Sequence, residues 1–277
     1  MGTFFAYATL AAYFLASGLC LAFFLAQRDS FCRGGAWMMG LGFITHTLGL
    51  GANIASQGLL TVVTFAGALS VFAWALVAAF LVLYWRHPIM VLGALVAPLA
   101  ALALAGSLIL PGGEATVSPA LRSFWVYLHI LLAFLGVAAF SLAGLGGIFY
   151  LIQERQIKGK KFGFFYRRLP SLEQLDALNY WCLSLGFPLL TGAIITGSLY
   201  AQLTLGRLWS WDPKEIFTLT AWLIYAVLLH ERLAVGWRGR RAALLAICGF
   251  LVLILTFVGA NLWLSSYHSF AAFTGRP

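Results

Sequence analysis

The chain is a succession of long apolar runs separated by short polar segments. Several runs reach about 20 residues without a charge, which is the length that a helix needs to cross a bilayer. They also lack the polar–apolar alternation of a strand, and a backbone in lipid must satisfy its own hydrogen bonds, so helices are predicted. Eight transmembrane helices are expected, at residues 4–26, 35–56, 63–85, 89–110, 124–152, 177–199, 214–230 and 242–263.

The composition agrees with a polytopic membrane protein. Of the 277 residues, 62% are hydrophobic and only 9% are charged, far from the usage of a soluble domain. The polar loops are too short for a second folded unit, so residues 1–277 are expected to form one all-α membrane domain. Residues 3–27 lack the basic leader of a signal peptide and are long enough to span, so they are expected to stay as the first helix.

Positive charges are distributed unequally over alternate loops, thirteen in one set and four in the other. The richer set is Arg28, Arg33, Arg86, Arg155, Lys158, Lys160, Lys161, Arg167, Arg168, Arg232, Arg238, Arg240 and Arg241, and the poorer set is Arg122, Arg207, Lys214 and Arg276. Basic loops stay in the cytoplasm, so both termini are predicted to be extracytoplasmic.

The net charge of +9 is therefore explained by membrane topology and by attraction to anionic lipid, and no nucleic-acid partner is expected. The longest polar loop, 154–172, mixes basic and aromatic residues. It is predicted to lie at the membrane interface, with docking of a partner as the alternative.

One polar stretch, Leu205–Glu215, stands between the sixth and seventh apolar runs and reads Leu-Gly-Arg-Leu-Trp-Ser-Trp-Asp-Pro-Lys-Glu. Asp212 followed by a proline and then by Glu215 predicts a helix N-terminus with a capping box. The cap does not explain Trp209 and Trp211, which lie on the predicted outer side. An aromatic belt at the membrane interface is one interpretation, and an aromatic platform for a ligand is the other.

Five histidines are the ionisable residues that fall within or beside the apolar runs. His46 lies near the middle of the second run, His87 at the turn after the third, His129 at the outer end of the fifth, His230 at the inner end of the seventh, and His268 in the outer tail. A buried ionisable group is costly unless it is partnered, so each is either a hydrogen-bonded packing residue or a functional one. The packing role is preferred for His87, which lies between Arg86 and Pro88.

The predicted topology places His129 and His268 at the level of the two tryptophans. Two imidazoles beside flat aromatic rings suit a metalloporphyrin, with nitrogens on the iron and indoles against the macrocycle. His46 and His230 offer a second bis-histidine site within the membrane. Four scattered cysteines without a Cys-x-x-Cys pair argue against thiol-redox chemistry or a cysteine metal site, and no phosphate-binding glycine loop is present.

The segment from Gly206 to Glu215 resembles the tryptophan-rich WWD signature of cytochrome c assembly proteins, the heme-handling membrane proteins of the CcsA, CcmC and HemX-like group. The likeness continues through Ala221–Tyr225 to His230, and upstream it includes Gly186–Gly192 and the Leu175–Tyr180 segment. It covers about 124–268, whereas 1–123 match only loosely. Leu205 stands where the signature usually has a tryptophan.

The resemblance implies a set of heme ligands. His129 and His268 would be external axial ligands of heme iron, and His230 a ligand within the membrane, completed by His46 or by a partner's histidine. Trp209, Trp211, Asp212 and Gly206 would form the loop that binds the cofactor, heme b.

The implied function is delivery of heme across the bacterial cytoplasmic membrane to apocytochrome c, as the CcsA-type component of a system II cytochrome c synthase, the heme-lyase complex. A CcsB/ResB-type membrane protein would be the partner. Eight spans favour the CcsA or HemX-like branch. The alternatives are a HemX-like heme-binding chaperone or regulator, an exporter of heme or of a small solute, and a b-type electron-transfer subunit.

Overall fold

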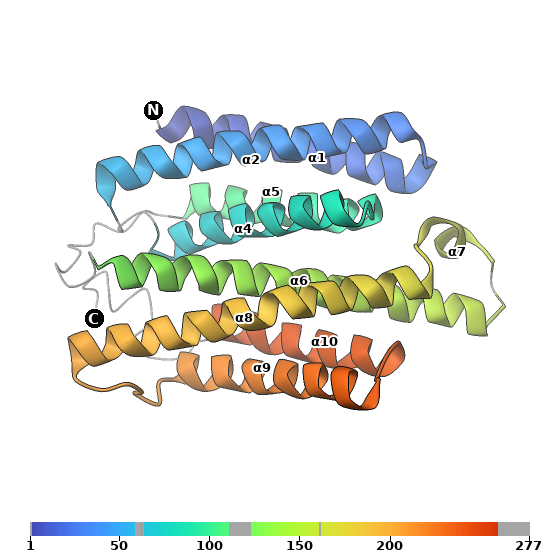
Figure 1. Ribbon diagram of the computed structural model, residues 1–277. Helices are drawn as coiled ribbons and strands as arrows, with labels where there is room; N and C mark the ends of the chain where they lie inside the picture. The colour runs from blue at the N-terminus through green and yellow to red at the C-terminus, as the bar shows by residue number, and fades with distance from the viewer. Residues whose placement is uncertain (1, 59–61, 63, 111–122, 161, 260–277) are drawn as a thin grey trace.

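The computed structural model describes residues 2–58, 62, 64–110, 123–160 and 162–259. Its long helices lie side by side in one bundle (Figure 1). They are α1 (Gly2–Ala26), α2 (Asp29–Gln57), α4 (Phe65–Arg86), α5 (Gly93–Ile109), α6 (Phe124–Lys158), α8 (Leu172–Leu205), α9 (Pro213–His230) and α10 (Arg240–Ile254). Short helical turns are η1 (Met90–Leu92), α7 (Phe164–Arg168), η3 (Glu231–Val235) and η4 (Leu255–Gly259). Within these ranges every regular element is helical, which confirms the predicted all-α class.

Seven helices in the described part of the chain are long and apolar enough to cross a membrane. The eighth long helix, α2, has 29 residues and packs along α1, but glycine, threonine and asparagine lower its hydropathy. The bundle is therefore that of a multi-pass membrane protein, with about the number of spans that the apolar runs predict.

The connections gather at two ends of the bundle (Figure 1). At one end, which we call the basic end, α1 meets α2, α4 meets α5, α6 meets α8, and α9 meets α10. The opposite one is the tryptophan end, where residues 206–212 join α8 to α9. Among the described residues, the loops at the basic end carry the richer set of positive charges, and those at the tryptophan end carry the poorer set. The membrane side that each end faces stays a prediction.

Helices α6 and α8 form the central pair, and small residues let them approach closely. A Cβ at Gly186 would lie 2.9 Å from the ring of Phe140, and one at Gly136 would lie 3.1 Å from the Leu190 backbone nitrogen. Close packing through glycine is a common way for membrane helices to associate. Helix α8 continues through Pro188 without a break.

Both central helices are longer than the apolar runs that predicted them. Helix α6 extends to Lys158 instead of ending near 152, and α8 starts at Leu172 instead of near 177. Ser171 and Gln174 explain the early start of α8, because each side chain accepts a hydrogen bond from the other residue's backbone nitrogen, at 3.2 and 3.1 Å. The added turns carry polar residues and lie at the basic end.

Candidate functional site: a tryptophan loop and its histidines

The loop at the tryptophan end begins where α8 is terminated. Gly206 has a φ of +68°, and its N–H donates to the Gln202 carbonyl at 3.1 Å. This left-handed cap favours glycine, since a side chain at such a φ is strained. Gly206 therefore has a clear structural role, because it turns the chain from α8 into the loop.

Glu215 organises the middle of the loop from the first turn of α9. Its Oε2 accepts hydrogen bonds from the Ser210 nitrogen at 2.8 Å and from the Asp212 nitrogen at 3.3 Å. The Asp212 carboxylate in turn accepts from the Lys214 nitrogen at 2.9 Å, and Asp212 is buried. The predicted capping box is confirmed, and the bond to Ser210 is an addition that the sequence did not predict.

Trp211 lies between the two nitrogens that bind this carboxylate. Its φ is +57°, a conformation that a large non-glycine residue rarely adopts. Backbone strain of this kind persists only where neighbouring bonds impose it, and it is often found at binding sites. Here Glu215 holds the backbone on both flanks of Trp211, so the direction in which this residue leaves the chain is set by the loop itself.

The two indoles meet edge to face, with ring centroids 6.2 Å apart and planes at 81°. Trp211 is 71% exposed, whereas Trp209 is half-buried. The Nε1 of Trp209 is buried and has no hydrogen-bond partner among the described residues. A buried N–H group without an acceptor is uncommon in a protein interior. A flat ligand with acceptor atoms on its edge would provide one.

His129 lies on α6 near the same end and is half-buried against α8. Its Nδ1 is 2.7 Å from the Ala193 carbonyl oxygen. A carbonyl can only accept, so Nδ1 carries a proton and donates it to this bond. A carbonyl on one ring nitrogen is the usual support for a histidine that binds metal through the other.

Gly197 makes room for this imidazole. A Cβ at this position would lie 2.8 Å from Nδ1 of His129. The second predicted external ligand, His268, lies outside the described residues.

The other two proposed ligands are not brought together. His230 is the last residue of α9, exposed at the basic end. His46 belongs to α2, and α2 and α9 lie at opposite edges of the bundle (Figure 1). The structure thus gives no single-chain site in which His46 and His230 bind one iron.

His46 is instead part of a buried hydrogen-bond network. Its Nδ1 lies 3.2 Å from the Tyr13 hydroxyl, and its Nε2 lies 3.0 Å from Ser70 Oγ. The ring faces a cavity of about 200 Å³ that Thr9 and Asn53 also line. With both nitrogens engaged, this histidine has the environment of a packing residue.

His87 lies in the turn between α4 and η1, with its ring edge against Trp181 at 6.1 Å between centroids. This environment is that of a packing residue.

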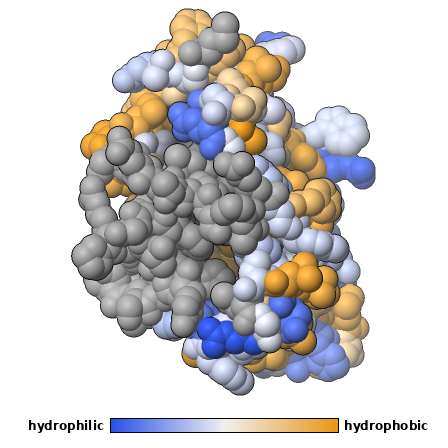
Figure 2. All heavy atoms as spheres, turned by 90° about the vertical axis from the view of Figure 1, so that its left-hand side faces the viewer, coloured by the Kyte–Doolittle hydropathy of each residue, from blue (hydrophilic) through white to orange (hydrophobic). Residues whose placement is uncertain are grey.

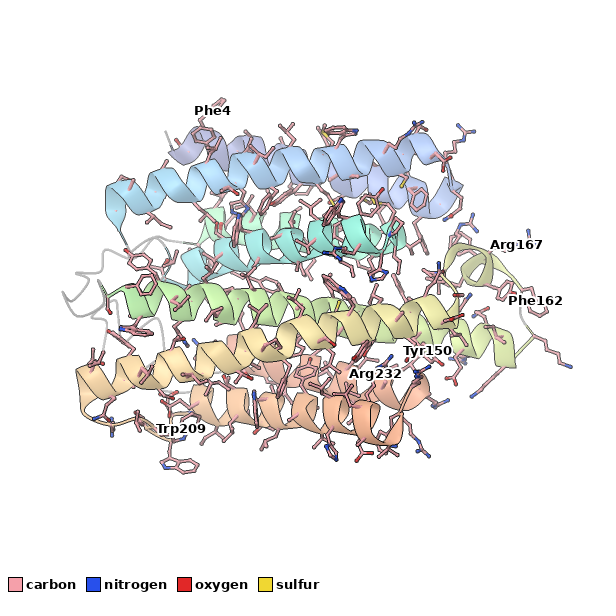
Figure 3. The ribbon with its side chains drawn as sticks, in the orientation of Figure 1. Phe4, Tyr150, Phe162, Arg167, Trp209 and Arg232 are labelled. Atoms are coloured by element: carbon pink, nitrogen blue, oxygen red, sulfur yellow. The ribbon has the colours of Figure 1, made fainter. Side chains whose placement is uncertain are left out.

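A polar clamp at the basic end holds the chain next to His230, and the sequence did not predict it. Arg232 binds both carboxylate oxygens of Asp176, at 2.6 and 3.1 Å, and the Gly239 N–H donates to the same carboxylate at 2.7 Å. Figure 3 shows Arg232 in this part of the bundle and Trp209 at the other end. The clamp connects α8 to the turn between α9 and α10.

The surface of the tryptophan end is mixed in character. Hydrophilic side chains form separate patches between hydrophobic ones around its rim (Figure 2). No group of three or more histidine, cysteine or acidic residues that could hold a metal ion occurs among the described residues.

Fold and site together define a multi-pass helical membrane protein with an ordered tryptophan loop at one end. The family model described as "Cytochrome C assembly protein" matches residues 62–268. The chain therefore belongs to the cytochrome c assembly protein family. The match begins well before residue 124, so it includes α4 and α5 as well as the part that carries the tryptophan signature.

Several curated proteins with the name cytochrome c biogenesis protein CcsA are similar to this chain. The one from Guillardia theta is 32% identical over 249 residues, which cover 83% of each chain. The one from Prochlorococcus marinus is 35% identical over 218 residues, 68% of this chain and 69% of its own length. The one from Chlamydomonas reinhardtii is 39% identical over 157 residues, but only 43% of that longer protein is covered.

Among solved structures, the chain described as cytochrome c heme lyase CcmF has the same fold, with a TM-score of 0.66 and 18% sequence identity. The alignment covers 99% of this chain and 49% of that one. The chain thus spans about half the length of this structural neighbour.

Proposed function

We propose that this chain acts in cytochrome c maturation by binding heme b at the tryptophan loop and presenting it to apocytochrome c on the outer side of the bacterial cytoplasmic membrane. The observation that carries the proposal is the hydrogen bond from His129 Nδ1 to the Ala193 carbonyl at 2.7 Å, which fixes the imidazole beside the tryptophan loop in the way that a backbone carbonyl supports a metal-binding histidine. Family membership and the CcsA relatives support the same role.

Heme is the cargo in this proposal, and the chain's own residues orient it. His129 and His268 would be the residues that hold the iron. The Trp209 and Trp211 rings pack against the macrocycle, and the buried Trp209 N–H fits an acceptor on its edge. Asp212 and Glu215 hold the loop without contacting heme. Presentation of heme requires orientation of the cofactor and no acid–base residue of the protein.

A second, transient heme site would involve His230 at the basic end. His46 is a poor counterpart, because Tyr13 and Ser70 engage both of its ring nitrogens. We therefore assign the second ligand to a histidine of a CcsB/ResB-type membrane partner. The basic end would face the cytoplasm, where heme enters, and both termini would lie outside, as the positive charges predict.

The test is the absorption spectrum of heme that copurifies with the full chain, coexpressed with its partner. We expect His129→Ala to lower bound heme by about tenfold or more, as loss of a metal ligand or its support does. His268→Ala should do the same. His46→Ala is the matched control and should keep its heme. An unchanged spectrum for His129→Ala would rule out the external site.

Formation of holocytochrome c in a reconstituted strain separates presentation of heme from mere binding. A chaperone or regulator of the HemX-like kind would bind heme through the same residues but would leave an apocytochrome without its cofactor. We expect the Cys-x-x-Cys-His motif of a reporter apocytochrome to acquire heme only with an intact His129.

A further inference from the structure

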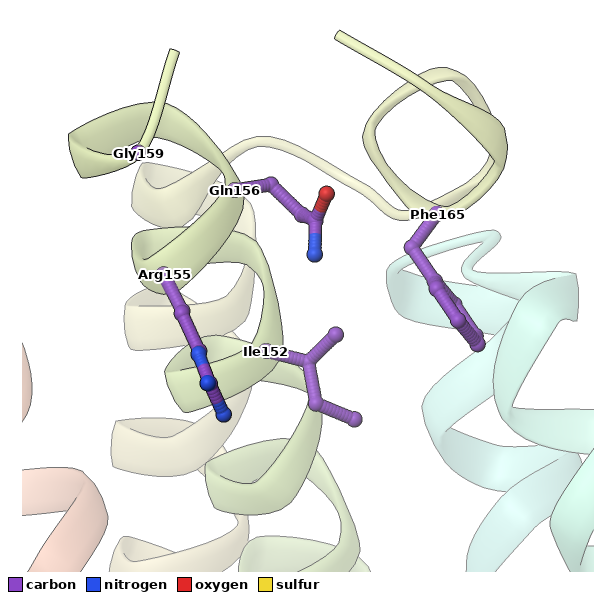
Figure 4. Close-up of a pocket in the computed structure, with 5 residues that line it drawn as sticks. All are labelled: Ile152, Arg155, Gln156, Gly159 and Phe165. Carbon is purple, nitrogen blue, oxygen red and sulfur yellow. The ribbon is translucent and has the colours of Figure 1, made fainter. Parts of the chain in front are cut away.

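A groove lies at the basic end between the last turns of α6 and the short helix α7. Its volume is about 370 Å³. Its lining combines apolar and polar side chains, from Ile152, Arg155, Gln156, Gly159 and Phe165 (Figure 4). It is far from the tryptophan loop, at the other end of the bundle, and takes no part in the proposed heme binding.

The walls of this groove are held in place by bonds across three helices. Gln153 of α6 donates to the Tyr166 carbonyl of α7 at 3.3 Å. Arg168 of α7 donates twice to the Leu25 carbonyl near the end of α1, at 3.1 and 2.6 Å. The ring of Phe24 on α1 also contacts Phe165, with centroids 6.4 Å apart. Helix α7 is therefore tied to both α6 and α1, and these contacts define the shape of the groove.

The polar groups of the groove are positioned for an anion. The exposed Arg155 side chain runs back along α6 toward the middle of the helix, and the Gln156 amide points across the gap toward α7 (Figure 4). Lys158 lies one turn further on. The neighbouring carboxylate, Glu154, already binds Lys158 at 2.7 Å and Arg240 at 3.5 Å. Glu154 is thus paired with other cations, and Arg155 is the basic residue that lines the groove.

The level of the groove relative to the membrane suggests what fills it. Helix α6 has 35 residues and is about 52 Å long at 1.5 Å per residue, against a hydrocarbon core of about 30 Å. The helix is therefore longer than this core is thick, and its charged last turn, with Arg155 and Lys158, is suited to the headgroup region. The exposed aromatic rings of Phe162, Phe164 and Tyr166 lie beside the groove, as interfacial aromatics do.

We propose that this groove binds an anionic glycerophospholipid. The lipid phosphate lies against the Arg155 guanidinium, the Gln156 amide donates a hydrogen bond to the headgroup, and an acyl chain follows Ile152 and Phe165. Basic pockets between membrane helices are suited to such headgroups. The site is independent of heme and goes beyond the proposed function.

The experiment is native mass spectrometry of the full chain in detergent, titrated with phosphatidylglycerol and separately with phosphatidylcholine. We expect tighter binding of phosphatidylglycerol. Arg155→Gln should weaken that binding by about fivefold, which corresponds to one basic residue at a membrane surface. Arg33→Gln is the matched control, since it removes an exposed charge from α2 at the same end and should leave binding unchanged.

A steric variant separates a groove from general attraction between charges. Ile152→Phe keeps every charge but fills the cavity, and it should weaken binding of phosphatidylglycerol while the Arg33→Gln protein still binds. Equal loss in Arg33→Gln and Arg155→Gln, or equal affinity for the two lipids, would overturn the proposal. Retention of phosphatidylglycerol by Arg155→Gln would do so too, even if Ile152→Phe fails to fold.

Discussion

The two ends of the bundle are stabilised in different ways. At the basic end the hydrogen bonds of the described residues join segments far apart in sequence, such as Arg232 to Asp176 and Arg168 to Leu25. At the tryptophan end the Glu215 bonds are local, since among the described residues its carboxylate accepts from Ser210 and Asp212, which lie within five positions of it. The Glu215 bonds therefore shape the loop without attaching it to other helices.

The difference matches the roles that we assign to the two ends. Long-range polar bonds fix helices relative to one another, so the basic end is a frame. A loop ordered by its own cap can keep its shape while a large ligand enters and leaves beside it. Three substitutions measure how far this contrast holds.

The largest effect is expected for Asp176→Ala at the basic end. It leaves Arg232 with a side chain only 8% exposed and without its carboxylate, and it removes the acceptor of the Gly239 N–H. Breaking a buried ion pair by removing one partner costs about 3–5 kcal/mol, and this partly buried pair should lose up to that amount. The midpoint of thermal unfolding in detergent should fall clearly. Glu173→Ala, an exposed residue in the same helical turn, is the control and should change little.

An intermediate effect is expected for Glu215→Ala. The backbone N–H groups of Ser210 and Asp212 lose a charged acceptor. A single hydrogen bond to a charged group contributes about 1.5–3 kcal/mol to stability. Glu215→Gln keeps one acceptor oxygen and should lose less. Copurified heme should fall in the alanine variant, because the Trp211 conformation is no longer imposed. If its unfolding midpoint dropped as far as that of Asp176→Ala, the contrast between the ends would fail.

The smallest effect is expected for Lys158→Ala. This lysine pairs with Glu154 at 2.7 Å, but its side chain is 65% exposed. Exposed ion pairs contribute roughly 0–1 kcal/mol, so unfolding should be nearly unchanged. A loss comparable to that of Asp176→Ala would show that the stability of the basic end depends on many surface charges and not mainly on the Arg232–Asp176 ion pair.

Much of the fold could be predicted because lipid leaves few choices for a backbone. Apolar runs indicated the long helices, and Asp212 with Glu215 marked the start of α9 correctly. The apolar runs did not indicate the end of α6, since polar turns beyond the hydrocarbon carry no apolar signal, whereas Ser171 followed by Glu173 and Asp176 does mark the start of α8 in the sequence. The extension of these helices depends on a cap at Ser171 and on contacts at the basic end.

The candidate site could be predicted less completely, because its supports come from distant residues. The loop between Gly206 and Glu215 was evident from its own composition. The Ala193 carbonyl beside His129 is 64 residues away in sequence, and backbone acceptors leave no trace in side-chain patterns. The same limit applies to His46, whose partners Tyr13 and Ser70 are ordinary residues on other helices.

Gly197 leaves the space on α8 into which the His129 ring fits. Because Gly197 and the Ala193 carbonyl both belong to α8, the angle of the imidazole depends on the distance between α6 and α8. Under the proposed function, a change in that distance would move the His129 ring relative to the iron that it holds and would so alter the ligand field of the iron. A shift between the two helices would then be readable as a change in the spectrum and reduction potential of the heme, before any bond to it breaks.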